Sequence, residues 1–311
     1  MTTDDNNMGR TPTLADVAGL AGVSTATVSR CLNSPDQVVE RTRKKVEDAV
    51  LKLGYAPNFN ARALAAKRTN TIGAIIPTME NAIFARGLQS FQEELGCSGV
   101  TLLVASSSYS TDLEEEQIRT LVSRGADGIL LIGLHRDPKI YEFLKRQNVP
   151  VVVAWVFDPN AKVPTVGFDN FSAMKALADR VISMGHRRLS TITASPQGND
   201  RASERLRGIY ASMMEAGIPK TELSIVEAEY GIDEGGAALE QLLCQTVRPS
   251  VVMCGNDVLA VGAIAKAQEL GLSVPNDISV TGFDDIEIAK ISSPALTTVH
   301  VPHRRMGKEA A

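Results

Sequence analysis

Residues 13–33 read TLADVAGLAGVSTATVSRCLN, and this stretch decides the fold of the N-terminal part of the chain. Thr13 is followed three residues later by Asp16, a pattern that predicts a capping box at the start of a helix. Apolar residues then recur at the spacing of one buried helix face, at Leu14, Val17, Ala18 and Ala21. Gly22-Val23 interrupts this pattern, and Ser24 offers a second N-cap. The stretch predicts two short helices joined by a tight turn, a helix-turn-helix.

The second helix of this motif, residues 24–33, has a face of small polar side chains at its N-terminal end. Its apolar positions, Val28, Cys31 and Leu32, predict that the opposite side is buried. In a helix-turn-helix the second helix enters the major groove of DNA with its N-terminal residues towards the base edges. A third helix over residues 40–53 would complete a three-helix core.

The segment after the third helix begins at Pro57, which ends that helix and presets the backbone for a new one. Asn58 is placed to cap residues 59–67, which are rich in helix formers but too few for a stable isolated helix in water. The pattern predicts a hinge that becomes helical only when it is supported. An ordinary Ala-rich linker is the alternative.

The charge of the chain is unevenly distributed, although the net charge is only −4. Residues 10–70 hold ten Lys/Arg against five Asp/Glu, whereas residues 71–311 hold 22 Lys/Arg against 29 Asp/Glu. A basic head on an acidic body suits localised binding to DNA phosphates. A solvated charged helix would give the same count.

Short apolar runs alternate with amphipathic runs from residue 72 onwards. Expected strands cover 72–76, 100–105, 128–132, 149–155, 189–193, 223–229, 251–254 and 278–282. Expected helices cover 84–95, 112–124, 170–184, 201–216, 233–244 and 257–270. This alternation predicts a parallel α/β body, and a natural split near Phe168-Asp169-Asn170 predicts two similar lobes.

Several classes of protein are disfavoured by what the 311 residues lack. No phosphate-binding glycine loop and no nucleophile elbow occurs, so we expect neither an enzyme nor a cofactor. His300 and His303 are interpreted as polar hinge residues rather than metal ligands, and no metal site is expected. No apolar run approaches the ~20 residues that cross a bilayer, and no signal peptide is visible. We therefore expect a soluble protein of the cytoplasm, associated with the bacterial nucleoid, with no membrane partner.

The motifs together resemble the lactose-repressor/galactose-repressor (LacI/GalR) family. The resemblance lies in residues 13–33 and in VVERTRKKVEDAVLKLGYAPNFNARAL (38–64), and it continues through VGFDN (166–170), ERLRG (204–208), GNDVLAVGA (255–263), VPNDISVTGFDD (274–285) and SPALTTV (293–299). It implies a small all-α helix-turn-helix head on an α/β two-lobed, periplasmic-binding-protein-like body. The expected domains are the head at 11–57, the hinge at 58–70, a first lobe at 71–168 plus 299–311, and a second lobe at 169–298. The chain stops at what resembles the beginning of a helix, so we expect the C-terminal part of the first lobe to be truncated.

The resemblance implies which head residues contact double-stranded operator DNA. The family's base-reading positions fall on Thr25, Ala26 and Arg30, of which Arg30 can pair with guanine through two hydrogen bonds. Phosphate contacts are expected from the hydroxyl or amide groups of Thr13, Ser24, Thr27, Ser29 and Asn33. Helix capping alone is the alternative for Thr13 and Ser24. In the hinge, DNA contacts are expected from Asn58, Ala61 and Leu64, with Leu64 at the position of the leucine that wedges a base step apart.

The resemblance also implies an effector cleft between the lobes, lined by the carboxyl ends of strands. Arg205 matches the family's ligand-holding arginine, with a surface ion pair as the alternative. Asn256 and Asp257 follow a strand, and the Asp257 carboxylate is expected to accept hydroxyl hydrogen bonds or to cap a helix. Asp169 is either a ligand contact or a connector. The remaining expected contacts are Trp155, Ile83, Phe84 and Tyr230, for which simple core packing is the alternative.

These expectations describe a transcriptional repressor that binds a pseudo-palindromic operator as a homodimer. A sugar or sugar acid is the leading expectation for the effector, and a purine-like ring is the second. The rival interpretation is a two-lobed sugar-binding receptor without a DNA function, which leaves the helix-turn-helix unexplained.

Overall fold

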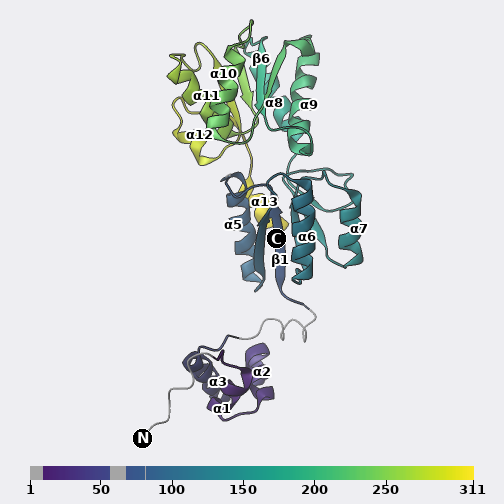
Figure 1. The fold of residues 1–311 in the computed structure, drawn as a ribbon, viewed down its shortest axis with the longest axis vertical. Coiled ribbons are helices and arrows are strands. Elements are labelled where there is room, and N and C mark those ends of the chain that lie inside the picture. The colour runs from purple at the N-terminus through teal and green to yellow at the C-terminus, as the bar shows by residue number, and fades with distance from the viewer. Residues whose placement is uncertain (1–9, 57–67, 81) are drawn as a thin grey trace. The chain divides into compact units, whose positions relative to one another are not determined.

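The structure is a computed structural model, which describes residues 10–56, 68–80 and 82–311. The chain divides into two compact units, Met1–Thr69 and Asn70–Ala311 (Figure 1). This division falls within one residue of the boundary expected between hinge and body.

The first unit is a three-helix head. Its helices are α1 (Leu14–Ala21), α2 (Thr25–Asn33) and α3 (Glu40–Leu53), with a 3-10 turn at Pro35–Gln37. Gly22 ends α1 in the left-handed conformation, with φ of 65°. Glycine adopts this conformation without steric strain because it has no Cβ, and α2 can then begin three residues later. The core forms around Val17, Val28 and Val46, one from each helix, and all three are fully buried. The three expected helices are confirmed.

The first lobe of the second unit is built on a five-stranded parallel sheet with the order β2-β1-β3-β4-β5. Its strands are β1 (Thr71–Ile76), β2 (Thr101–Ser106), β3 (Gly128–Ile132), β4 (Val151–Ala154) and β5 (Thr165–Val166). One face carries α5 (Ala82–Cys97) and α13 (His303–Ala310), which pack on each other. The other carries α6 (Thr111–Ser123) and α7 (Pro138–Arg146), whose apolar sides form a separate core.

The second lobe repeats the architecture with the strand order β10-β9-β8-β6-β7, again all parallel. Its strands are β6 (Leu189–Thr193), β7 (Leu223–Glu227), β8 (Val251–Cys254), β9 (Ser279–Asp284) and β10 (Thr297–His300). The helices are α8 (Asn170–Ser183) and α9 (Asp200–Glu215), which pack together, α10 (Ile232–Leu243) and α11 (Asp257–Glu269), which pack together, and the short α12 (Glu287–Ile291) (Figure 1).

The central strands are buried on both faces, which explains why they read as apolar runs rather than alternating ones. All five residues of β3 and all five of β6 are buried. In β6 the buried hydroxyls of Ser190 and Thr191 donate to the carbonyls of Val251 (2.8 Å) and Met253 (2.7 Å) on β8. Polar residues are therefore tolerated there because each finds a backbone acceptor.

The chain passes between the lobes after β5 and again after β10, so that α13 returns to the first lobe. The strands and helices expected from periodicity are present, with ends that differ by a few residues. Among the described α-helices and strands, α7, β5, α12 and β10 were not anticipated, whereas α13 is the helix whose beginning was expected at the end of the chain. Because β10 belongs to the second sheet, Val299 and His300 lie in the second lobe and not, as expected, in the first. Within the described ranges, no helix combines the length and apolar character needed to cross a membrane.

Candidate functional site

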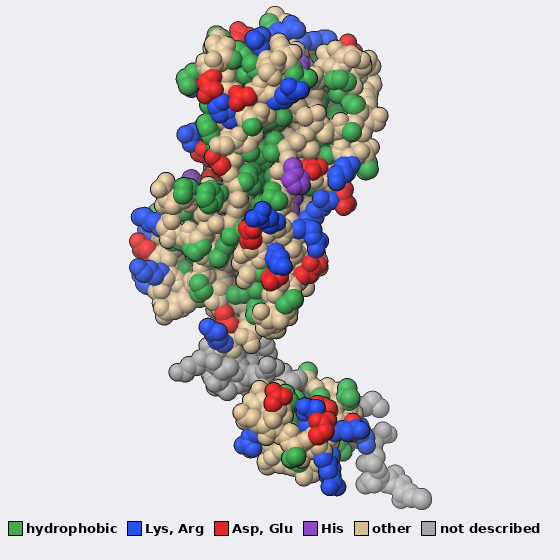
Figure 2. Space-filling view, turned by 180° about the vertical axis from the view of Figure 1, so that it is seen from behind, with side chains coloured by type: hydrophobic (Ala, Val, Ile, Leu, Met, Phe, Trp, Pro, Cys, Tyr) green, Lys and Arg blue, Asp and Glu red, His purple; other side chains and the backbone are tan. Residues whose placement is uncertain are grey.

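The outer face of α2 presents the three residues expected to read bases. Thr25, Ala26 and Arg30 are all exposed, and Arg30 forms no ion pair with any residue in the described part of the chain. Figure 2 shows several Lys and Arg side chains on the visible face of the head, with Asp and Glu side chains between them. A guanidinium that is exposed and unpaired is available to a nucleic acid.

The hydroxyl residues around α2 are engaged with the helix itself. Ser24 caps α2 by accepting from the Thr27 N–H at 3.2 Å, and its Oγ lies 2.9 Å from the Thr27 hydroxyl. Asn33 Nδ2 donates to Ser29 Oγ at 3.2 Å. Capping leaves lone pairs and hydroxyl protons on these groups, so it is compatible with a phosphate contact.

Thr13 forms the expected capping box at the start of α1. Its N–H and its hydroxyl donate to the Asp16 carboxylate at 2.7 and 2.6 Å, while the Asp16 N–H donates back to Thr13 Oγ1 at 3.4 Å. The hydrogen bond from the Thr13 hydroxyl lowers the pKa of Asp16. The expected hinge contacts Asn58, Ala61 and Leu64 lie outside the described residues.

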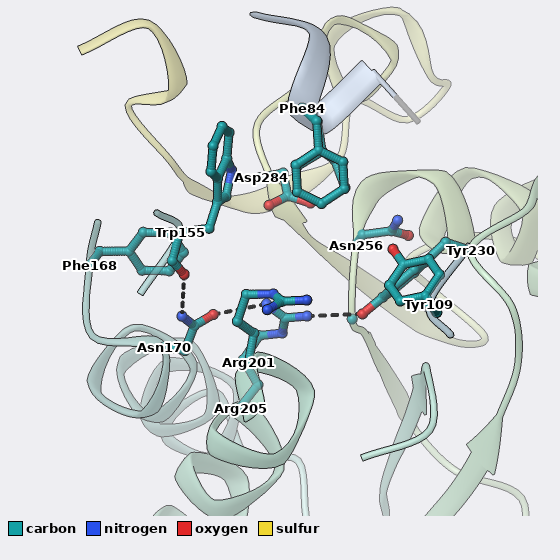
Figure 3. Close-up of a pocket in the computed structure, with 12 residues that line it drawn as sticks. Phe84, Tyr109, Trp155, Phe168, Asn170, Arg201, Arg205, Tyr230, Asn256 and Asp284 are labelled. Atoms are coloured by element: carbon teal, nitrogen blue, oxygen red, sulfur yellow. Dashed lines mark hydrogen bonds between the residues drawn. The ribbon is translucent and has the colours of Figure 1, made fainter. Parts of the chain in front are cut away.

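The second unit contains a pocket between its two lobes (Figure 3). It has about 380 Å³ of empty space, part of which is open to solvent. Six of the eight predicted effector residues line it: Ile83, Phe84, Trp155, Arg205, Tyr230 and Asn256. The other six lining residues were not expected to contact the effector: Tyr109, Phe168, Asn170, Arg201, Gly255 and Asp284.

The polar floor of the pocket is organised around Arg205, which projects from α9 and is 8% exposed. Its Nη1 donates to Asn170 Oδ1 at 2.9 Å and its Nη2 donates to Tyr230 Oη at 3.1 Å. Asn170 in turn donates to the carbonyl of Trp155 at 3.1 Å, which links the first lobe to the second. The guanidinium also stacks on Phe283, 4.8 Å from the ring centroid. Arg205 is therefore held in one orientation, and the alternative of a surface ion pair is wrong.

Aromatic rings form the opposite side of the pocket. Phe84 meets Trp155 edge to face, with ring centroids 5.4 Å apart, and Tyr109 of the first lobe lies 5.7 Å from Tyr230 of the second. Trp155, Tyr109 and Asp284 all have positive φ values, of 60°, 59° and 109°. Non-glycine residues rarely adopt this conformation, and such strain concentrates at binding sites.

Trp155 is also joined to the second lobe through His303. The indole Nε1–H donates to His303 Nδ1 at 3.2 Å, and Nε2 of the same ring lies 3.1 Å from the Asp284 carbonyl. Nδ1 must be unprotonated to accept from tryptophan, so the proton sits on Nε2 and is donated to that carbonyl. Burial lowers the pKa of His303 to about 4, which keeps the ring neutral. His303 thus serves as a polar hinge residue, and among described residues no cluster is arranged to hold a metal ion.

A second contact between the lobes lies at the entrance to α9. Asp200 Oδ2 accepts from the Leu134 backbone N–H of the first lobe at 2.5 Å, while Oδ1 pairs with Arg201 Nη1 at 3.0 Å. Gly133 has φ of 74°, and a Cβ at this position would collide with both Arg201 and Asp200. The close approach of the lobes here therefore requires glycine.

Two predicted effector residues, Asp169 and Asp257, do not line the pocket. Asp169 caps α8 by accepting from the Ser172 N–H at 3.1 Å. Asp257 is fully buried, where Oδ2 accepts from the Ile286 N–H at 2.8 Å and Oδ1 from the Thr298 hydroxyl at 2.5 Å. Burial outweighs these hydrogen bonds and raises the pKa of Asp257 to about 6. Both carboxylates are engaged in contacts within the protein. The helix cap expected of Asp257 is wrong, because Asn256 is the N-cap of α11.

The carboxyl group that does face the pocket is Asp284, at the end of β9. It is buried, and burial raises its pKa well above the usual range for an aspartate despite the nearby Arg205 and Arg201 guanidinium groups. The motif VTGFDD carries this residue, and VGFDN carries Asn170, so both were within stretches that resembled the family. Arg201 lies one helical turn before Arg205, a spacing that places both on the same face of α9.

An exposed helix-turn-helix and a pocket between two parallel α/β lobes define a class of protein, the DNA-binding regulators that carry a small-molecule sensor. Residues 13–58 match the family model for bacterial regulatory proteins of the lacI family. Residues 69–311 match that for periplasmic binding proteins and the sugar binding domain of the LacI family. The chain belongs to the LacI family, and it is a DNA-binding transcriptional repressor with an effector-binding domain, not an enzyme.

Three comparisons illustrate how far the similarity extends. The chain is 32% identical over 298 residues to catabolite control protein A of Priestia megaterium, covering 96% of this chain and 90% of the relative. It is 33% identical over 300 residues to the HTH-type transcriptional repressor CytR of Escherichia coli K12, covering 96% and 87%. The crystal structure of the lac repressor dimer bound to operator and the anti-inducer ONPF matches with a TM-score of 0.83 at 26% identity, covering 96% of this chain and 90% of that one.

Proposed function

We propose that this protein is a cytoplasmic homodimeric repressor of a pseudo-palindromic operator, and that a sugar or sugar acid bound in the cleft changes its affinity for DNA. The observation that carries the effector assignment is the composition of the pocket wall. Hydrogen-bonding side chains from Asn170, Arg205 and Asn256 face the aromatic rings of Phe84 and Trp155. A sugar needs both, because its hydroxyls require donors and acceptors while its C–H faces pack on aromatic rings.

The DNA part of the proposal rests on α2 and on the symmetry of dimers. One head offers three base-reading positions, Thr25, Ala26 and Arg30, which is too few to select an operator alone. Two heads related by a two-fold axis read two half-sites in opposite orientation. The lac repressor, which is similar over 96% of this chain, is bound to its operator as a dimer.

The binding site can be found by selecting DNA from a random pool with the full chain. We expect enriched sequences in which two related half-sites face each other around a centre of symmetry. Enrichment of isolated half-sites, together with a monomer in sedimentation, contradicts the dimeric proposal.

A flat purine-like ring is the second candidate for the effector, and the facing Tyr109 and Tyr230 rings favour it because aromatic side chains stack on nucleobases. Trp155 is the only tryptophan of the chain and lines the pocket, so its fluorescence can report on occupancy. We expect sugars or sugar acids, and not adenine or nucleosides, to change this emission and to shift the midpoint of operator binding. A response to nucleobases without any response to carbohydrates assigns the cleft to the second candidate.

A further inference from the structure

We propose that the effector is a monocarboxylate, a polyhydroxy acid whose carboxylate pairs with Arg205 while Asn256 donates to one of its oxygens. This inference rests on the proposed function, since it assigns a charge to the carbohydrate ligand of the same cleft. It separates acids from neutral sugars, which the general composition of the pocket does not.

The first observation is that Arg205 is a buried cation whose partners are neutral. Its two hydrogen bonds go to the Asn170 amide and the Tyr230 hydroxyl, and it forms no ion pair with any of the residues described. Its Nε–H is buried and has no acceptor in the described structure. A buried charge of this kind is costly unless an anion completes its surroundings.

The neighbouring acid does not supply this anion. Asp284 is buried, and neither a hydrogen bond nor an ion pair joins its side chain to Arg205 among the described residues. Asp200 is the other carboxylate close by, and it is already shared between Arg201 and the Leu134 N–H. In the described pocket, Arg205 is therefore a guanidinium that no carboxylate pairs with.

The second observation is a buried donor on the other side of the cavity. Asn256 is 1% exposed, and its Oδ1 caps α11 by accepting from the Leu259 N–H at 2.8 Å. The cap fixes the orientation of the amide of this pocket-lining residue, so the group left over is Nδ2, which has no partner among described atoms. Asn256 and Arg205 thus both present donors that lack acceptors.

A carboxylate matches this arrangement in both charge and hydrogen bonding. When ionised it only accepts hydrogen bonds, and it carries one negative charge against the one unpaired guanidinium. A phosphate brings about 1.5 to 2 negative charges at pH 7 and would leave the buried site with excess negative charge.

The test is isothermal titration calorimetry on the full chain with matched pairs of ligands. Gluconate and glucuronate are compared with glucose, galacturonate is compared with galactose, and glucose 6-phosphate and adenosine complete the set. We expect at least one acid to bind at least about 30-fold more tightly than its neutral partner, the ratio that a buried charge pair supports. Equal or tighter binding of a neutral sugar or of the phosphate overturns the monocarboxylate and leaves the carbohydrate sensor standing. A set in which only adenosine binds, or in which nothing binds, overturns both.

Three variants test whether Arg205 provides the positive charge that binds the carboxylate of the ligand. Arg205→Gln removes the positive charge and should reduce the ratio of acid to neutral affinity to within about 3-fold of unity. Arg207→Gln makes the same change two residues further along α9, at an exposed arginine paired with Glu204 (2.6 Å), and should leave the ratio intact. If Arg205→Gln does not fold, Asp284→Asn decides: an Asp284 carboxylate that does not pair with Arg205 predicts acid affinity within about 3-fold of wild type or tighter, whereas loss of acid binding overturns the proposal.

Discussion

The indole Nε1–H of Trp155 donates to His303 Nδ1 at 3.2 Å, which ties the end of strand β4 to the first residue of α13. The same imidazole reaches the backbone of Asp284 in the second lobe. The neutral imidazole of His303 therefore connects three parts of the protein by hydrogen bonds: the Trp155 wall of the pocket, the crossover between the lobes, and the end of β9. Protonation of Nδ1 would place two donors against each other and break the first of these bonds.

The stability of the folded protein should consequently fall in mild acid. The pKa of His303 is lowered from 6.5 to about 4, so between these values the unfolded chain binds a proton that the folded chain does not. This contribution is fully present above pH 6.5 and is lost as pH decreases towards 4, by up to about 3 kcal/mol. Chemical denaturation measured across this range should show a smaller slope for His303→Gln, whose amide offers one donor and one acceptor. Equal slopes in the two proteins would contradict the assignment.

Asp257 acts in the opposite direction, because burial raises its pKa from 3.8 to about 6. The folded state binds a proton more readily than the unfolded chain, so this group adds stability as pH falls from 6 towards 3.8. Asp257→Asn should make the protein more stable at pH 7, by up to about 3 kcal/mol, since the Thr298 hydroxyl can turn and accept from the new amide. Effector affinity, measured by Trp155 fluorescence, should stay within about 3-fold of wild type. If the folded variant no longer bound effector, the result would indicate that Asp257 contacts the ligand after all.

The packing of α5 against Trp155 leaves no room for a side chain at Gly87, because a Cβ there would overlap the indole ring. Gly87→Ala should displace the tryptophan, shift its emission, and destabilise the protein by about 1 to 3 kcal/mol. Gly96 lies in the same helix, and a methyl group at that position would meet no described atom within 4 Å, so it provides a matched control. Gly96→Ala should be neutral or stabilising by up to about 1 kcal/mol. An unchanged emission spectrum in Gly87→Ala would contradict this packing.

Arg30 should carry both sequence recognition and part of the electrostatic affinity of the head. Arg30→Ala should weaken binding to the selected operator by about 1 to 3 kcal/mol and relax the preference at one base pair. Arg30→Lys keeps the charge but loses the planar fork, so it should retain the salt dependence while losing the preference. Fluorescence anisotropy at several salt concentrations separates these effects. Equal loss on operator and random DNA in Arg30→Lys would reduce Arg30 to a phosphate contact.

Much of this architecture could be predicted because short-range patterns determine it. The capping residues Thr13 and Ser24, the glycine between the head helices and the apolar runs of β3 and β6 each specify an element locally. The elements that were missed, such as the two-residue β5, are stabilised by tertiary packing rather than by a pattern of their own.

The residues of the pocket were harder to predict, because acidic residues in similar sequence positions point in different directions in the structure. Asp257 and Asp284 both belong to motifs that resemble the family and both lie at strand ends, yet only Asp284 faces the cavity. The Asp257 side chain turns towards Thr298, which lies 41 residues away in sequence. A partner at that separation leaves no signal in the residues around Asp257.

The hydrogen bond between the Leu134 backbone N–H and the Asp200 carboxylate responds differently to mutation at its two ends. The donor is a backbone N–H, which every amino acid except proline supplies, so position 134 can drift during evolution without loss of the bond. The acceptor is one carboxylate with no local substitute. A substitution at Asp200 should therefore remove this bond, whereas a substitution at Leu134 keeps it and loses only the packing of the Leu134 side chain on the core of the first lobe.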